Sequence, residues 1–251
     1  MTTPQTVLVA GGSGKLGGPI VRGLSGQGFR VAVPTRSVEG AATRLSDVAA
    51  DSLVLIAADL AAPDGIGVIL RELEHLELSI TKLVYSARSL DSLAIGADGE
   101  TGRSEFLAEF ELQTVIPYQL TMALAHSDRH ALDSVVLMGS QYGLVAPNPE
   151  LYEGTLARSP VQYGVAKAAL HHLTRELAVR LAPAVRVNAV AFGGFEGRVD
   201  ADFRDRYSRM VPMNRMLRQE EAIGPVQFLL SDDASSIRGH VLVADGGWSI
   251  W

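Results

Sequence analysis

The stretch "VLVAGGSGKLGG", Val7 to Gly18, decides the fold, because closely spaced glycines directly follow an apolar run. One interpretation of "GSGK" is the phosphate loop of an ATP- or GTP-using enzyme, which requires G-x-x-x-x-G-K-[ST]. Here Leu16 follows Lys15, so the hydroxyl that would hold magnesium is absent. Val9 stands where the first glycine of that motif belongs. The sequence therefore disfavours a phosphate loop.

The same stretch fits the first turn of a dinucleotide-binding fold. Gly11, Gly14 and Gly17 lie three residues apart, directly after the apolar run. Glycines at such positions permit a tight turn, close approach of a pyrophosphate and close helix packing. The helix that follows would offer N–H groups to the pyrophosphate. A purely structural strand-to-helix turn is the alternative, since a glycine pattern alone has low specificity.

Two basic residues near this turn favour NADP(H) over NAD(H). Arg36 follows the second apolar run, where NAD-specific folds place an acidic residue against the ribose 2′-hydroxyl. Lys15 lies within the glycine turn itself. Together they can neutralise a 2′-phosphate. The alternative is that Arg36 is an ordinary solvated surface residue.

Short apolar runs alternate with helix-like segments along the whole chain. This alternation predicts one α/β domain, residues 1–251, with a doubly wound parallel sheet. The expected strands are Thr6–Ala10, Arg30–Pro34, Leu53–Ala57, Lys82–Ser86, Ser134–Gly139, Arg186–Ala191 and Val241–Ala244. The expected helices cover 16–27, 39–50, 64–79, 104–128, 160–181 and 219–231. Long loops are expected at 87–103, 141–159 and 192–218, each after a strand, where open α/β sheets bind ligands.

The composition excludes several classes of protein. The chain has 251 residues and a formal net charge of -6, so no global field attracts nucleic acid. It has no cysteine, which excludes disulfides and thiolate catalysis and fits a reducing cytoplasm. No apolar run approaches the roughly 20 residues of a membrane span, and no signal peptide is evident. We therefore expect a cytoplasmic protein with no nucleic-acid or membrane partner.

A second stretch, "SPVQYGVAKAAL" from Ser159 to Leu170, points to acid–base chemistry. Tyr163 and Lys167 are four residues apart and share one face of the predicted helix. An ammonium near a phenol lowers the pKa of the phenol, which allows proton exchange with a carbonyl or alcohol oxygen. Ser140 ends the preceding strand, where its hydroxyl can bond the same oxygen. The histidines at 126, 130, 171 and 172 offer no convincing metal site.

These motifs, in this order, resemble the short-chain dehydrogenase/reductase family over nearly the whole chain. The further matching segments are Ala58–Leu60, Gly139–Gly143, Val185–Gly194 and Phe228–Gly247. The resemblance implies a Rossmann fold with seven parallel strands, a nicotinamide cofactor and hydride transfer. It implies Tyr163 as general acid/base, with Lys167, Ser140 and Gln113 completing the catalytic group. The cofactor-binding residues it implies, together with those inferred above, are Gly11, Ser13, Gly14, Lys15, Leu16, Gly17, Arg36, Asp59, Leu60, Ala87, Tyr163, Lys167, Phe192 and Gly193.

The chain departs from the family pattern at three positions. Arg88 stands where the family usually has glycine, and this cation can pair with a phosphate or a substrate anion, or point to solvent. Gln113 replaces an asparagine, and its extra methylene can displace a water relay to Lys167. Phe192 replaces a proline. An insertion between Ser140 and Tyr163 brings further candidates for the substrate pocket, namely Tyr152, Glu153 and Arg158.

The sequence thus predicts an NADP(H)-dependent ketoreductase that acts on a small carbonyl or alcohol metabolite, with 192–218 as a substrate-covering loop. Two other functions stay open: a non-catalytic NADP-binding regulator or scaffold, and an epimerase or dehydratase using the same cofactor. The apolar terminus "GGWSIW" favours a homotetramer or homodimer, with packing onto the protein's own core as the alternative.

Overall fold

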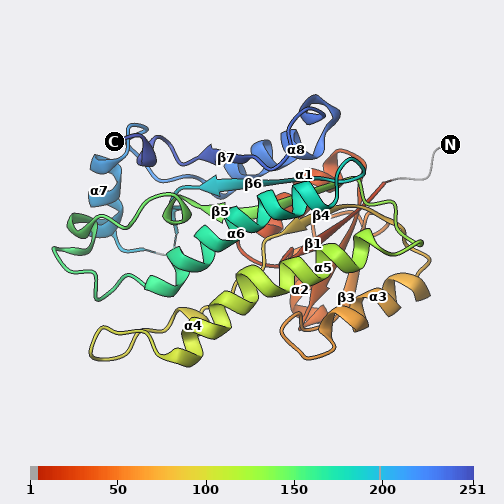
Figure 1. Ribbon diagram of the computed structural model, residues 1–251, viewed down its shortest axis with the longest axis horizontal. Helices are drawn as coiled ribbons and strands as arrows, with labels where there is room; N and C mark the ends of the chain where they lie inside the picture. Colours follow the sequence, from red (N-terminus) through yellow and green to blue (C-terminus); the bar gives the residue numbers. More distant parts are fainter. Residues whose placement is uncertain (1–4, 198) are drawn as a thin grey trace.

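One seven-stranded parallel sheet forms the centre of the computed structural model, which describes residues 5–197 and 199–251 (Figure 1). Residues 1–4 of the predicted domain, and Arg198 of the predicted loop 192–218, lie outside the described residues. The strand order is β3-β2-β1-β4-β5-β6-β7, and all six ladders are parallel. This confirms the doubly wound sheet. The strands are β1 Thr6–Ala10, β2 Arg30–Thr35, β3 Leu53–Ala57, β4 Ile80–Tyr85, β5 Ser134–Ser140, β6 Arg186–Phe192 and β7 Val241–Ala244.

Helices cover both faces of the sheet, which explains why most of its strands are apolar without alternation. Residues of α3, α5 and α6 join one apolar cluster, and residues of α1 and α8 join the other, together with Leu45 directly after α2. In Figure 1, α5 and α6 lie across the near face. The helix bounds are α1 Gly17–Gly26, α2 Val38–Arg44, α3 Gly65–His75, α4 Arg103–Phe110, α5 Ile116–Ala125, α6 Val161–Arg180, α7 Ala201–Met210 and α8 Ile223–Leu230.

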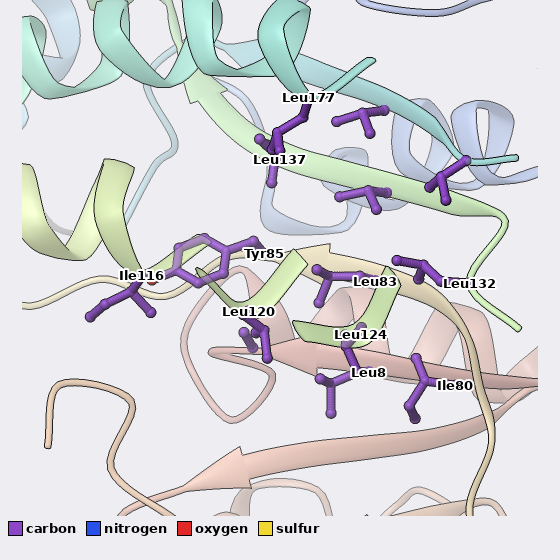
Figure 2. Packing of buried hydrophobic residues seen from close by; sticks show 14 of the residues in the cluster. Leu8, Ile80, Leu83, Tyr85, Ile116, Leu120, Leu124, Leu132, Leu137 and Leu177 are labelled. Carbon is purple, nitrogen blue, oxygen red and sulfur yellow. The ribbon is translucent and has the colours of Figure 1, made fainter. Parts of the chain in front are cut away.

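The core beneath α5 holds the central strands in place for the site. Leu120 and Leu124 of α5 are fully buried against the sheet, together with Leu8 of β1 and Leu83 of β4 (Figure 2). Burying a leucine side chain is worth about 1.5–3 kcal/mol. The ends of β1 and β4 are therefore fixed relative to one another, and ligand-binding loops start from both.

Two predicted segments differ most from the structure, and the predicted helix 39–50 ends early, at Arg44. The predicted helix 104–128 is split into α4 and α5 by a wide π-helical turn, Glu111–Val115. The predicted loop 192–218 contains a helix, α7. Its sequence is mostly polar and charged, so only Tyr207 among its residues is fully buried. Its apolar stripe is short, consisting of Phe203, Tyr207 and Met210 at i, i+4 and i+7 spacing, and it stands among polar and charged residues that are typical of a loop.

Among the described residues, no helix is both long and apolar enough to cross a membrane.

Candidate active site

A cavity of about 1120 Å³ lies at the carboxyl ends of the strands. In open α/β sheets, ligands bind at this edge, where the strand order reverses. The cavity extends from the glycine turn after β1 to the end of β5 and to the first turns of α6. The predicted catalytic and cofactor-binding residues all line it: Gly11, Ser13, Gly14, Lys15, Leu16, Gly17, Arg36, Asp59, Leu60, Ala87, Gln113, Ser140, Tyr163, Lys167, Phe192 and Gly193.

The glycine turn is packed so closely that a side chain at Gly11 or Gly17 would meet backbone atoms, and its surface is therefore open to a dinucleotide. Gly11 has a φ of +79°, and a Cβ there would lie 2.7 Å from the backbone of Ala87. A Cβ on Gly17 would lie 2.1 Å from the carbonyl oxygen of Gly11. The first turn of α1 has no side-chain cap and no acidic residue. Such a helix end suits an anionic group, so the residues present fit the pyrophosphate of a nicotinamide cofactor.

Basic residues gather beside this turn, though in a different arrangement from the predicted one. Arg36 is exposed at the end of β2 and lines the cavity, as expected. Lys15 instead donates a hydrogen bond to the carbonyl oxygen of Glu196, at 2.6 Å. Arg44, which was not among the predicted site residues, donates from Nε to the carbonyl oxygen of Ser13 at 2.9 Å and lines the same cavity. The available signal was a basic residue on the helix that follows Arg36.

Lys167 is held at the centre of a buried polar group. Its Nζ donates to Oε1 of Gln113 at 2.7 Å and to the carbonyl oxygen of Met138 at 2.6 Å. Nε2 of Gln113 donates in turn to the carbonyl oxygen of Ala87 at 3.3 Å. The glutamine amide therefore contacts the lysine directly. Gln113 lies in the π-helical turn, a feature that is frequent at functional sites.

Tyr163 and Ser140 line the cavity within hydrogen-bond reach of each other, and Lys167 and Arg88 lie beside the Tyr163 ring. The Lys167 Nζ lies 5.8 Å and the Arg88 Cζ 5.6 Å from the ring centroid. Burial raises the pKa of Tyr163, while the charge of Arg88 and a hydrogen bond with Ser140 oppose this rise. The net direction is opposite to the predicted lowering, because the burial outweighs the cation. Burial also lowers the pKa of Lys167 to about 8.

Aromatic side chains form a further part of the cavity wall. Tyr142, Tyr152 and Phe203 line the cavity, and the hydroxyls of Tyr142 and Tyr152 are 3.0 Å apart. Of the three candidates in the insertion, only Tyr152 lies at the cavity. Glu153 and Arg158 form an exposed ion pair of 3.0 Å instead.

Tyr207 of α7 also lines this wall, and the sequence analysis missed it. Its hydroxyl donates to Oε1 of Gln141 at 3.0 Å and accepts from the backbone N–H of Gly194 at 2.8 Å. It thereby joins α7 to the segments that follow β5 and β6. In Figure 1, the arrowheads of β6 and β7 point toward α7.

The comparisons with known proteins agree with this geometry. A family model described as Enoyl-(Acyl carrier protein) reductase matches residues 13–249. The chain belongs to the short-chain dehydrogenase/reductase family. Members of this family bind a nicotinamide cofactor and generally act on small molecules. The predicted family and its Rossmann fold are thus confirmed.

Two solved structures similar to this chain hold different nicotinamide cofactors, one NADP and the other NAD+. A rhamnolipids biosynthesis 3-oxoacyl-[acyl-carrier-protein] reductase of Pseudomonas aeruginosa is 29% identical, over 98% of this chain and 96% of the relative. The Pseudomonas aeruginosa RhlG/NADP active-site complex has a TM-score of 0.83 at 27% identity, covering 98% and 97% of the two chains. A short-chain dehydrogenase of Leptospira borgpetersenii with bound NAD+ shares the fold, with a TM-score of 0.83 at 23% identity over 98% and 93%.

One buried histidine of this short-chain dehydrogenase/reductase supports the backbone at Ser140 and Gly143. His171 of α6 is buried, and its Nε2 lies 3.4 Å from the Ser140 backbone N–H, from which it accepts. Its Nδ1 lies 3.2 Å from the Gly143 carbonyl oxygen, which assigns the ring proton to Nδ1. A Cβ on Gly139 would lie 2.3 Å from this ring. A Cβ on Gly143 would also lie against it, so the imidazole occupies the space that the absent side chains of Gly139 and Gly143 leave.

Acid is expected to destabilise the protein through His171. Burial lowers its pKa from 6.5 to about 4. Between these values the unfolded chain binds more protons than the folded one, so stability falls as the pH falls. Between pH 7 and pH 4.5 this group accounts for a loss of about 2 kcal/mol. Urea denaturation of His171→Gln should show a correspondingly smaller acid loss.

The matched control is His172→Gln, since the side chain of His172 is 72% exposed on the same helix. It should keep the acid loss of the wild-type protein. An equal acid loss in His171→Gln would show that other groups determine it.

Proposed function

We propose that the protein is an NADP(H)-dependent oxidoreductase that reduces a carbonyl on a small metabolite, or oxidises the matching alcohol. The observation that carries this proposal is the convergence of Tyr163, Lys167, Ser140 and Gln113 on one cavity with the glycine turn. The 3-oxoacyl reductase among the relatives supports carbonyl chemistry.

In the proposed reduction, each of these side chains has a separate role. A bound nicotinamide cofactor would supply a hydride to the carbonyl carbon. Tyr163 donates its phenolic proton to the carbonyl oxygen, and Ser140 orients that oxygen by a hydrogen bond. The phenolate that remains is stabilised by the nearby cations and regains a proton from solvent. Gln113 keeps the Lys167 ammonium in place through its 2.7 Å bond.

The charges near the ends of β2 and α2 support the proposed preference for NADP(H). Arg36 and Arg44 are both exposed there and line the cavity beside Ser13. Arginine binds phosphate oxygens through its planar fork of donors. We propose that these two residues hold the 2′-phosphate, with Lys15 contributing charge from the glycine turn.

Fluorescence titration with NADPH and with NADH tests the cofactor assignment. We expect NADPH to bind about 10–100-fold more tightly, the range that charged hydrogen bonds provide. Arg36→Met with Arg44→Met should remove most of this difference and leave NADH affinity within a few-fold. Equal affinities in the wild-type protein would contradict the assignment.

A panel of aldehydes, ketones and oxo acids, followed by the loss of NADPH absorbance, tests the reaction. Turnover of at least one carbonyl supports the oxidoreductase. Tight binding of NADPH without turnover of any of them would favour the non-catalytic alternative.

We also propose a cytoplasmic homotetramer or homodimer. Trp248 is buried and stacks on Tyr207 at 4.6 Å between ring centroids, so it packs on the protein's own core. Trp251 and Ile250 are 77% and 71% exposed. These two residues offer apolar surface to a second copy.

A further inference from the structure

Arg88 places a positive charge next to the proposed catalytic tyrosine. It is exposed and lines the cavity directly after Ala87, where β4 has ended. Its guanidinium carbon lies 5.6 Å from the centroid of the Tyr163 ring.

The N–H donors of Arg88 have no partner among the described residues, although its charge acts on the Tyr163 ring. Within residues 5–197 and 199–251, no ion pair or hydrogen bond of its side chain is formed. By contrast, Lys15 and Arg44 bond backbone carbonyl oxygens in the cofactor half of the cavity. An arginine facing a cavity with its five donors unused is suited to an anionic ligand.

A role in balancing the buried carboxylate of Glu109 explains Arg88 less well. Glu109 is fully buried on α4, and its Oε2 accepts a hydrogen bond of 2.5 Å from the Ser92 hydroxyl. Its other oxygen has no hydrogen-bond partner among the described residues. If Arg88 served this carboxylate, the two would form an ion pair, and they do not.

We propose that Arg88 binds a carboxylate of the substrate, which makes the substrate a 2-oxo or 3-oxo acid. This inference rests on the proposed carbonyl reduction. The reacting oxygen must lie about 2.6–3.2 Å from the Tyr163 hydroxyl, and a carboxylate about 2.7–2.9 Å from the guanidinium nitrogens. The guanidinium of Arg88 lies beside the Tyr163 ring. A substrate whose carbonyl reaches the Tyr163 hydroxyl and whose carboxylate reaches Arg88 therefore has these two groups only a few bonds apart.

Matched acids and esters test the proposal in the cofactor-saturated protein. The probes are pyruvate against methyl pyruvate and acetoacetate against methyl acetoacetate. We expect the wild-type kcat/KM of one acid to exceed that of its ester about 10–100-fold, as for a charge-assisted pair. Arg88→Met should remove this preference for the acid over its ester, and Arg88→Lys should restore part of the preference. Equal values for acid and ester in the wild-type protein would overturn the proposal.

A cofactor phosphate is the other possible source of the anion. If Arg88 held that phosphate, Arg88→Met would weaken NADPH binding and leave the ratio of acid to ester kcat/KM unchanged, which would overturn the proposal. Arg36→Met provides the comparison, since its effect should fall on NADPH and not on the ratio of acid to ester.

A binding measurement separates this inference from the proposed reaction. If no carbonyl is reduced, the proposed function fails, and malonate, which has no ketone, is titrated into the protein saturated with NADPH. Binding that is lost in Arg88→Met supports a carboxylate site. Binding that is absent, or unchanged by the substitution, overturns it.

Discussion

Replacing Tyr163 with phenylalanine is expected to lower kcat for any carbonyl that the wild-type protein reduces by about 10²–10⁴-fold, the usual contribution of a general acid. The substitution removes only the hydroxyl. The ring that contacts the Arg88 guanidinium and lies near Lys167 remains. Cofactor affinity and stability should therefore change little, and stopped-flow measurement of one turnover would place the loss in the chemical step.

Tyr118→Phe is the matched control, because Tyr118 is 43% exposed on α5 and does not line the cavity. Its kcat should equal that of the wild-type protein. Full activity in Tyr163→Phe would show that another group donates the proton, and the proposed roles of Ser140 and Lys167 would lose their basis.

The fold and the position of the site could be predicted because both depend on patterns of adjacent residues. Buried parallel strands are continuous apolar runs, such as Val7–Ala10, and their carboxyl ends define where ligands bind. Tyr163 and Lys167 share a helix, so their spacing alone places them together. Each of these inferences needs only one segment of sequence.

The remaining features depend on residues that meet only after folding. Lys15 and Glu196 are 181 positions apart, and nothing in either segment indicates their hydrogen bond. The wide turn at Glu111–Val115 leaves no compositional mark, although it is where Gln113 reaches Lys167. The direction of the pKa of Tyr163 depends on how much water folding removes from the phenol, which spacing does not record.

The glycine turn provides the other large expected effect, since Gly17→Ala should disrupt both the turn and cofactor binding. A Cβ at this position would lie 2.1 Å from the carbonyl oxygen of Gly11 and 2.7 Å from the Cα of Gly12. Both obstacles are backbone atoms, so the turn must move as a unit. Overpacking of this kind costs about 1–3 kcal/mol of stability. A movement of the turn also displaces the N–H groups proposed to hold the pyrophosphate, so NADPH affinity should fall at least about tenfold, which corresponds to 1.4 kcal/mol.

Gly26→Ala separates these effects from the general consequence of adding a methyl group to α1. Gly26 is the last residue of the same helix, and a Cβ there meets nothing within 4 Å. Alanine is the better helix former by up to about 1 kcal/mol, so this variant should be as stable as the wild-type protein or more so. NADPH titration and urea denaturation of both variants decide the matter. If Gly17→Ala matched Gly26→Ala in both measurements, the turn would tolerate a side chain, and close backbone approach of the cofactor at Gly17 would be wrong.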